Sequence, residues 1–217
     1  RYEKFYDAIK EKYPDINIIF SAGPHASGPL FHSAWEWVKK TGKADIVDEH
    51  FYMPPEWFFN NVDRYDDYDR NGPKVFIGEY AAHTPSRRNN MEAALAEAAF
   101  LTGVERNSDI VVMASYAPLL GKVGASQWQP NLIWFNNVSL YGTPSYYVQK
   151  MFSENRGDFI LPLELSVPKK EDEKSIKGMV GLGSWATQVE YKDFKVIGED
   201  GRVIFSDDFS GEASSQR

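Results

Sequence analysis

The sequence contains no cysteine and no long apolar run, and each absence excludes a class of protein. Without cysteine among its 217 residues, the chain has neither a disulfide framework nor a thiolate nucleophile. No apolar stretch approaches the roughly 20 residues that a membrane-spanning helix needs. The compartment stays unknown at this stage, with an extracellular or periplasmic location slightly favoured over a cytoplasmic one.

Motifs for metal, nucleotide and serine chemistry are also absent. The four histidines stand alone, without H-x-x-x-H or H-E-x-x-H spacing, so the sequence predicts no metal site. No G-x-G-x-x-G or Walker loop favours a nucleotide fold, and no G-x-S-x-G indicates a serine hydrolase. We therefore predict no cofactor.

Charge and composition limit the partners. The formal net charge is -7, which argues against binding to nucleic acid or to an anionic membrane surface. Hydrophobic residues make up 42% of the chain, enough for a buried core.

The sequence starts at Arg1 inside a helical pattern and stops shortly after a strand-like segment, so we expect it to be a fragment of a longer protein.

The first two-thirds of the chain alternates predicted strands and helices. Short β-branched or apolar runs predict four strands, at Ile16–Ser21, Ala44–Tyr52, Lys74–Tyr80 and Asp109–Tyr116. Helical spacing and end signals predict helices at Arg1–Tyr13, Leu30–Lys40, Glu56–Arg70, Asn89–Arg106 and Thr143–Ser153. Asn89 with Glu92 predicts a capped start for the fourth helix, and the last strand reads as buried on both faces.

This order predicts an α/β fold with a parallel sheet. The strands recur about every 30 residues, the repeat of an eight-stranded (β/α)8 TIM barrel, which needs ~250 residues in all. Four units amount to half of such a barrel, and a doubly wound sheet stays open on the pattern alone.

The sequence pattern changes after Phe159, where the alternation of predicted strands and helices ends. Leu161–Leu165 reads as a β segment and Lys169–Lys177 as a solvated charge run. Short antiparallel strands are expected at Gly178–Gly183, Val189–Val196 and Arg202–Phe205, with a turn between Gly198 and Gly201. We predict a partial (β/α)8 domain over residues 1–158 and a partial β-sandwich domain over residues 159–217.

Polar residues gather where the predicted strands end. Glu79 closes the apolar run Lys74–Tyr80, and a carboxylate at the carboxyl end of a parallel strand is a catalytic candidate. Strand alternation puts Asp48, His50 and Tyr52 on one side of the second strand, where the last two could hydrogen-bond a carboxylate. Glu49, on the other side, reads equally well as a structural partner and as a substrate contact.

A carboxylate in an aromatic-rich barrel suggests glycoside hydrolysis. Retaining glycosidases place a nucleophilic carboxylate ~5 Å from an acid/base carboxylate. Glu79 fits the nucleophile, and no second strand-end glutamate is an obvious acid/base.

Four segments resemble the α-L-arabinofuranosidases of glycoside hydrolase family 51. They are Asp48–Tyr52, Val75–Tyr80, Ala114–Pro118 and Trp128–Phe135. The match runs in order over about residues 1–155, and the region Gly178–Phe209 resembles the β-sandwich that follows the barrel.

The resemblance implies a role for each matched residue. Glu79 would be the nucleophile at the end of the seventh barrel strand, so the four strands would be the fifth to eighth. His50 and Tyr52 would hold the nucleophile and the arabinose ring. Gln129 or Asn131, near Trp128, would contact the sugar, with the choice between the two open.

The same resemblance implies a parent enzyme that releases terminal α-L-arabinofuranosyl residues with retention. Its substrate would be an arabinose-containing oligo- or polysaccharide, and its oligomeric state is left open. The family's acid/base glutamate would lie before Arg1, so we expect the isolated chain to be inactive or nearly so. Two alternatives stay open, namely another retaining barrel glycosidase of the xylanase or glucanase kind, and a non-catalytic carbohydrate-binding protein.

Overall fold

The computed structural model describes residues 1–161, 194–197 and 201–207. The chain separates into two compact units, Arg1–Pro162 and Leu163–Arg217. None of the helices in this described part has the length and apolar character to cross a membrane.

The first unit begins with alternating helices and strands. In chain order these are α1 (Tyr2–Lys12), β1 (Ile19–Ser21), α2 (Pro29–Thr41), β2 (Ile46–Met53), α3 (Pro55–Asn60), β3 (Lys74–Ala82), α4 (Met91–Arg106) and β4 (Val111–Tyr116). Three short strands and a helix follow, β5 (Leu120–Lys122), β6 (Ile133–Phe135), β7 (Leu140–Gly142) and α5 (Pro144–Glu154). The predicted strand–helix order is confirmed.

Strands β1 to β4 form one sheet in their sequence order, and each neighbouring pair is parallel. The predicted α/β fold with a parallel sheet is therefore correct. Because neighbouring strands are parallel and a helix connects each strand to the next, the carboxyl ends of all four strands lie at the same edge of the sheet.

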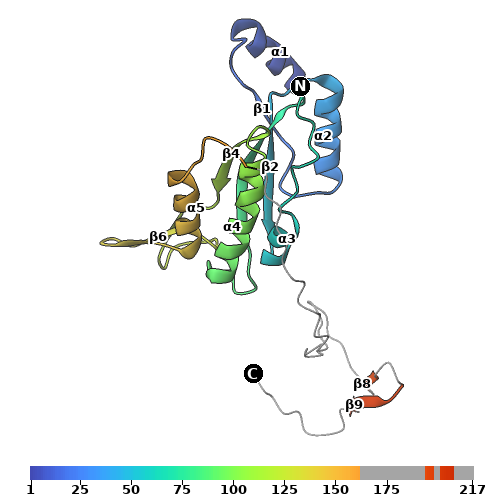
Figure 1. Cartoon of the computed structure of the whole chain (residues 1–217), viewed down its shortest axis with the longest axis vertical. Helices are drawn as coiled ribbons and strands as arrows, with labels where there is room; N and C mark the ends of the chain where they lie inside the picture. Colours follow the sequence, from blue (N-terminus) through green and yellow to red (C-terminus); the bar gives the residue numbers. More distant parts are fainter. Residues whose placement is uncertain (162–193, 198–200, 208–217) are drawn as a thin grey trace. The chain divides into compact units, whose positions relative to one another are not determined.

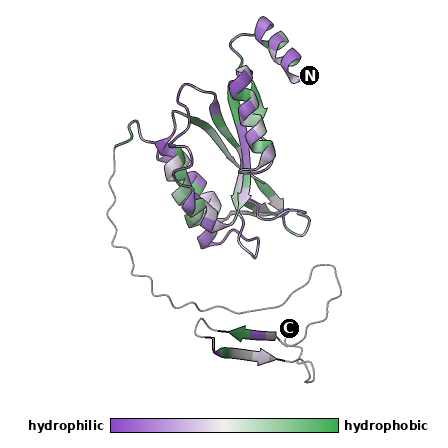
Figure 2. Ribbon diagram, turned by 90° about the vertical axis from the view of Figure 1, so that its right-hand side faces the viewer, coloured by the Kyte–Doolittle hydropathy of each residue, from purple (hydrophilic) through white to green (hydrophobic). Residues whose placement is uncertain are grey.

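The helices cover one face of this sheet. Figure 1 shows α4 lying along the strands, with α2 and α5 on either side of it. Val47 and Phe51 of β2 are fully buried on this face, the first in a cluster with α2 and the second in the cluster that includes α4. Helix α1 contributes no buried residue, and Figure 2 shows it mostly in the hydrophilic colour.

The helix predicted over Glu56–Arg70 is wrong in length, because α3 ends at Asn60. Asparagine and aspartate dominate the next ten residues, and these side chains favour turns over helix interiors. Successive four-residue turns replace the helix, with Arg64 N–H bonded to the Asn61 carbonyl at 3.1 Å and Tyr68 N–H to the Tyr65 carbonyl at 3.3 Å.

Two further details of the sequence reading are wrong. Strand β4 is not buried on both faces, because its side chains Val112 and Met113 are 44% and 42% exposed. Helix α4 is capped one residue later than expected. The side chain of Asn90, rather than Asn89, accepts the Ala93 N–H at 2.9 Å.

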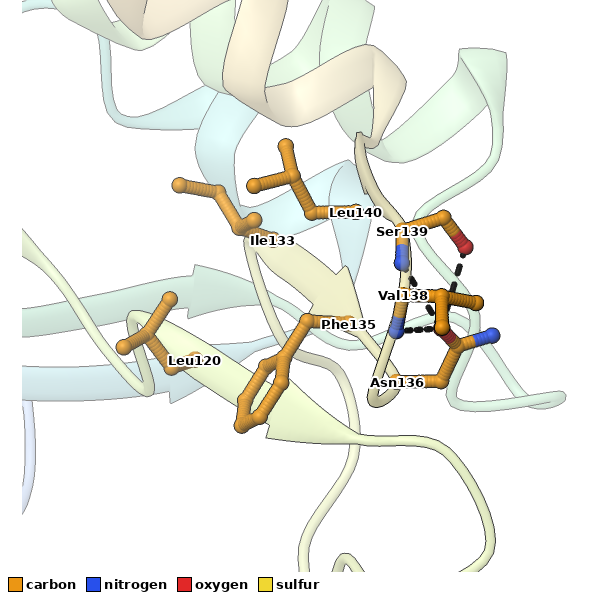
Figure 3. A pocket seen from close by; sticks show the side chains of 7 residues that line it. All are labelled: Leu120, Ile133, Phe135, Asn136, Val138, Ser139 and Leu140. Atoms are coloured by element: carbon orange, nitrogen blue, oxygen red, sulfur yellow. Dashed lines mark hydrogen bonds between the residues drawn. The ribbon is translucent and has the colours of Figure 1, made fainter.

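The strands β5, β6 and β7 form a second, three-stranded sheet that the sequence did not predict. Each has only three residues, too few for a period-two pattern to register. An apolar pocket of about 580 Å³ lies on this sheet, and Figure 3 shows the hydrophobic residues that line it, Leu120, Ile133, Phe135, Val138 and Leu140. Asn136 folds the adjoining turn by accepting the backbone N–H groups of Val138 and Ser139.

In the second unit the structure describes one antiparallel pair, β8 (Phe194–Ile197) with β9 (Val203–Asp207). This pair confirms the antiparallel pairing predicted here for the part of the chain around Val196 and Phe205, while residues 189–193 of the first predicted strand lie outside the described residues. The predicted segments Lys169–Lys177 and Gly178–Gly183, and Leu161–Leu165 after its first residue, lie outside the described residues.

Candidate functional site

The site is built on the face of the sheet that the helices do not cover. Along β2, burial alternates, with Val47, Glu49 and Phe51 fully buried and Asp48 and His50 partly exposed on the opposite side. The alternation predicted for this strand is therefore correct. It presents one side of the strand to the helices and the other to the site.

The side chain of Glu79 in β3 points to the same face only because β3 has a β-bulge at Gly78. Its register with β2 runs Ile77 opposite Glu49 and then Glu79 opposite His50, so Gly78 is skipped. Strict alternation would put Glu79 on the side of the buried Ile77. The extra residue reverses the order, so that Tyr80 is buried at 0% exposure and Glu79 points to the side of His50.

Glu79 is held through one of its two carboxylate oxygens. The Tyr52 hydroxyl donates a 2.6 Å hydrogen bond to Oε2, and His50 Nδ1 lies 3.7 Å from the same atom. Burial, and then the hydrogen bond to Glu79, raise the pKa of Tyr52 well above its usual value, which keeps the hydroxyl a donor. Within the described structure both contacts go to Oε2, so Oε1 is the oxygen that can act on a substrate. The side chain is 44% exposed.

Asp48 stands behind His50. Its Oδ2 lies 2.8 Å from His50 Nε2, and the carboxylate side chain is 15% exposed. Burial raises the pKa of Asp48, and the neighbouring His50 opposes the rise. Asp48, His50 and Glu79 therefore form a line of carboxylate, imidazole and carboxylate across two adjacent strands.

An aromatic wall flanks the carboxylate. The ring of His83 stacks on Tyr52 with centroids 5.1 Å apart, and the half-exposed Trp128 meets Tyr52 edge-on at 6.0 Å. Such a wall of flat rings next to a carboxylate suits a sugar ring. The resemblance of its segment to the family predicted Trp128 as a residue of the site. His83 was not predicted, because its position four residues after Glu79 matches no metal-binding or catalytic motif.

His83 is held as a neutral ring. The Arg87 guanidinium donates to Nδ1, so the ring proton must be on Nε2. Burial, together with the positive Arg87, lowers the pKa of His83 to about 4. Near neutral pH it therefore adds an uncharged face to the wall.

The two candidate sugar contacts after β5 lie in different surroundings. Asn131 is 1% exposed, and its amide donates to the Ser126 hydroxyl and to the Trp128 carbonyl, so it shapes the loop that carries Trp128. Gln129 is exposed on that loop. The exposure of Gln129 and the burial of Asn131 favour Gln129 over Asn131 for contact with a ligand.

Glu49 is a structural carboxylate. It is fully buried and accepts five hydrogen bonds, from the side chains of Trp35, Arg64 (two), Tyr65 and Tyr68 at 2.9 to 3.2 Å. Of its two readings from the sequence, the structural one agrees with this burial. The network anchors the turns after α3 to the helix-covered side of β2, next to the residues of the site.

A second buried carboxylate, Glu97 of α4, was not singled out from the sequence. It is fully buried, and its Oε1 accepts the Ala82 N–H at 2.9 Å, at the end of the strand that bears Glu79. Burial raises its pKa to about 7. A Glu inside an alanine-rich apolar helix face was the available signal.

Metal-ligand geometry is absent from the described residues. Among residues 1–161, 194–197 and 201–207, no group of three or more His, Asp or Glu side chains is arranged to hold a metal ion.

Two family models match the chain. Residues 65–215 match the α-L-arabinofuranosidase C-terminal domain, and residues 1–70 match the α-L-arabinofuranosidase 1 domain. The chain is 46% identical to an extracellular exo-α-L-arabinofuranosidase of Streptomyces chartreusis over 99% of its own length and 25% of that protein. It is 45% identical to α-L-arabinofuranosidase 2 of Arabidopsis thaliana over 74% of its own length and 22% of the relative.

Two solved structures of family 51 α-L-arabinofuranosidases are similar to this chain. An arabinose-bound GH51 α-L-arabinofuranosidase superposes with a TM-score of 0.62 at 35% identity, over 73% of this chain and 26% of that one. A family 51 enzyme of Bifidobacterium longum shares the fold at a TM-score of 0.54 and 11% identity, over 70% of this chain and 38% of its own. The chain spans about a quarter of the length of the curated relatives it matches.

Proposed function

The chain belongs to the α-L-arabinofuranosidases of glycoside hydrolase family 51, and from that premise we propose that it carries the nucleophile of a retaining arabinofuranosidase. The proposal rests on Glu79. Its Oε2 is held by Tyr52 and faces His50, while Oε1 is left to react. Terminal α-L-arabinofuranosyl groups on an oligo- or polysaccharide are the proposed substrate.

The reaction takes two steps. Glu79 Oε1 attacks the anomeric carbon, the bond from that carbon to the leaving oxygen breaks, and a general acid gives this oxygen a proton. Water then attacks the same carbon and gives one proton to the carboxylate left by the general acid, which releases Glu79 as a carboxylate and yields arabinose. Because the carbon is inverted twice, the product keeps the configuration of the substrate.

Tyr52 and His50 assist both steps from the same position. A carboxylate held through Oε2 needs no reorientation before attack, and pre-oriented donors stabilise the carboxylate that leaves in the second step. The wall of Tyr52, His83 and Trp128 would bound the arabinose, with Gln129 as the polar contact.

The general acid is proposed to be a carboxyl group outside these 217 residues. The chain matches about a quarter of the Streptomyces relative, and no second carboxylate among the described residues joins Glu79 at Oε1. Since general acids contribute typically 10²–10⁴-fold, the chain by itself should be inactive or nearly so.

We also propose the architecture that this role requires. Residues 1–158 would form part of a (β/α)8 barrel, in which strands β1 to β4 are strands five to eight. Residues 159–217 would form part of a β-sandwich domain. Helices on one face and the site at the carboxyl ends of the strands support this reading. The Streptomyces relative is named extracellular, and we propose the same location here.

The test is made on the full-length protein that contains this chain. Glu79→Gln keeps the shape of the side chain and removes its nucleophilicity, so turnover of an aryl α-L-arabinofuranoside should fall by at least about 10⁴-fold. Glu92→Gln, on the exposed start of α4, is the matched control and should leave the rate unchanged. A Glu79→Gln enzyme as fast as the wild type would exclude Glu79 as the nucleophile.

Two further measurements separate the alternatives. Aryl xylosides and glucosides test for another retaining glycosidase, which would prefer them to the arabinofuranoside. Arabinoxylan bound without hydrolysis would indicate a carbohydrate-binding protein. Trapping an arabinosyl group on the peptide that contains Glu79, detected by mass, would identify the covalent step directly.

A further inference from the structure

The last residue of β3 depends on a side chain for its backbone hydrogen bond. Strand β4 stays beside β3 only as far as Tyr80, whose carbonyl accepts the Ala117 N–H at 3.2 Å. On the other side of β3, His83 N–H donates to the Met53 carbonyl of β2 at 2.8 Å. Successive N–H groups of a strand point to opposite neighbours, so the Ala82 N–H points to the side that β4 has already left.

Glu97 of α4 supplies the missing acceptor. Its Oε1 lies 2.9 Å from the Ala82 nitrogen, and both residues are 0% exposed. Because neither residue reaches solvent, water cannot take over the role of this acceptor. A carboxyl group inside an alanine-rich apolar helix face is costly, and accepting a buried backbone N–H offsets part of that cost.

The Glu97–Ala82 bond lies one residue away from the aromatic wall. Alternation along the end of β3 buries Tyr80 and Ala82 on the side that the helices cover. The same alternation turns His83 to the site side, where its ring stacks on Tyr52 with centroids 5.1 Å apart. Because His83 follows Ala82 directly, a shift of Ala82 would move the His83 ring relative to Tyr52.

We propose that Glu97 is a positioning residue of the aromatic wall, which through Ala82 sets where His83 stacks and so how tightly the arabinose ring is bound. The proposal deepens the function proposed above and rests on it. The nucleophile depends less on this bond, because Tyr52 holds Glu79 from β2. A contact that binds substrate and transition state alike changes KM rather than kcat. Glu97 should therefore control affinity for the sugar.

Both protonation states of Glu97 can hold Ala82. Burial raises the pKa of Glu97 to about 7, and the Ala82 N–H and the Ser145 side chain oppose the rise. A carboxylate and the carbonyl oxygen of a neutral carboxyl group both accept a backbone N–H. Glutamine offers the same carbonyl oxygen at the same reach, so it should replace the acid, whereas methionine fills similar space without an oxygen.

The experiment measures kcat, KM and inhibition by free L-arabinose in the full-length protein. Glu97→Met should raise KM for an aryl α-L-arabinofuranoside, and the inhibition constant of arabinose, by about 10-fold, with kcat within about 3-fold of the wild type. Glu97→Gln should keep both constants within about 2-fold of the wild-type values.

The matched control is Leu101→Ala, one turn further along α4. It removes apolar atoms from the same buried cluster and none of the hydrogen bonds at the end of β3. The control should lower the melting temperature and leave both constants unchanged. An equal rise of KM in Leu101→Ala would reduce the effect of Glu97 to a general loss of stability and overturn the inference.

The Glu97 variants can also overturn it. A folded Glu97→Met enzyme with wild-type KM and arabinose inhibition would show that the wall does not depend on this bond, and a Glu97→Gln enzyme as impaired as Glu97→Met would show that the acceptor is not what matters. If Glu97→Met does not fold, Glu97→Asp takes its place, because its carboxyl group stops one methylene short of Ala82. Its KM should rise, and an unchanged KM contradicts the proposal. Each of these failures leaves the effect of Glu79→Gln untouched, so it is distinguishable from a failure of the proposed function.

Discussion

Gly78→Ala tests whether the β-bulge positions the site. The added Cβ would lie 2.0 Å from Asp48 Oδ1, and real Cβ contacts essentially never fall below 3.0 Å. The carboxylate must therefore retreat by about 1 Å, and His50, hydrogen-bonded to it at 2.8 Å, must move or lose that bond.

A displacement of this size in a positioning group can cost on the order of 10²-fold in rate. We expect kcat/KM of the full-length Gly78→Ala protein on an aryl α-L-arabinofuranoside to fall by about that factor. Overpacking should also lower the free energy of unfolding, by roughly 1–3 kcal/mol. Both quantities are needed, because a loss of activity in a well-folded protein assigns the effect to the site.

The matched control is Gly157→Ala, where a Cβ would meet its nearest described neighbour, the Phe159 carbonyl, at an ordinary 3.6 Å. This variant should match the wild type in rate and stability. A Gly78→Ala enzyme with wild-type kcat/KM would refute the reasoning, because it would mean that Asp48 and His50 are not packed against the backbone of β3.

Two buried carboxylates give the remaining predictions. Glu49→Gln leaves the Arg64 guanidinium buried without its counter-charge, so thermal denaturation should show a loss of about 3–5 kcal/mol, and an unchanged melting temperature would contradict the network. Glu97 has a pKa raised from 4.5 to about 7, so the native state binds more protons than the unfolded state between these values and its stability falls as pH rises, by about 1.4 kcal/mol per unit. Denaturant midpoints at pH 5 and pH 7 should show this fall in the wild type and in the exposed control Glu105→Gln, but not in Glu97→Gln.

The sequence predicts the elements well where long patterns repeat. The parallel order of β1 to β4 followed from strands alternating with helices, and the site face of β2 followed from period-two alternation between Asp48 and Tyr52. These are local patterns that the fold preserves. The length of α3 was missed because turn-forming side chains were outweighed by an apparent helical period, and because Arg64, Tyr65 and Tyr68 all converge on Glu49.

The geometry of the site was less accessible from sequence. Glu79 was chosen because it ends an apolar strand, yet alternation counted from Ile77 would have turned it toward the helices. Only the bulge at Gly78 brings it to His50 and Tyr52, and a glycine within a strand is an ambiguous sign of such a bulge. Contacts between strands, such as the stacking of His83 on Tyr52, depend on this register and could not be derived from spacing.

The close approach of Gly78 to Asp48 also constrains how the chain can evolve. Any side chain at position 78 would occupy the space that Asp48 Oδ1 now fills, so a larger residue at position 78 is tolerated only after the residue at position 48 has become smaller or has moved. Across an alignment of relatives, positions 48 and 78 should therefore covary, with bulk permitted at either one but not at both. The two positions are adjacent in space although they are 30 apart in sequence, so substitutions at the two positions should occur together.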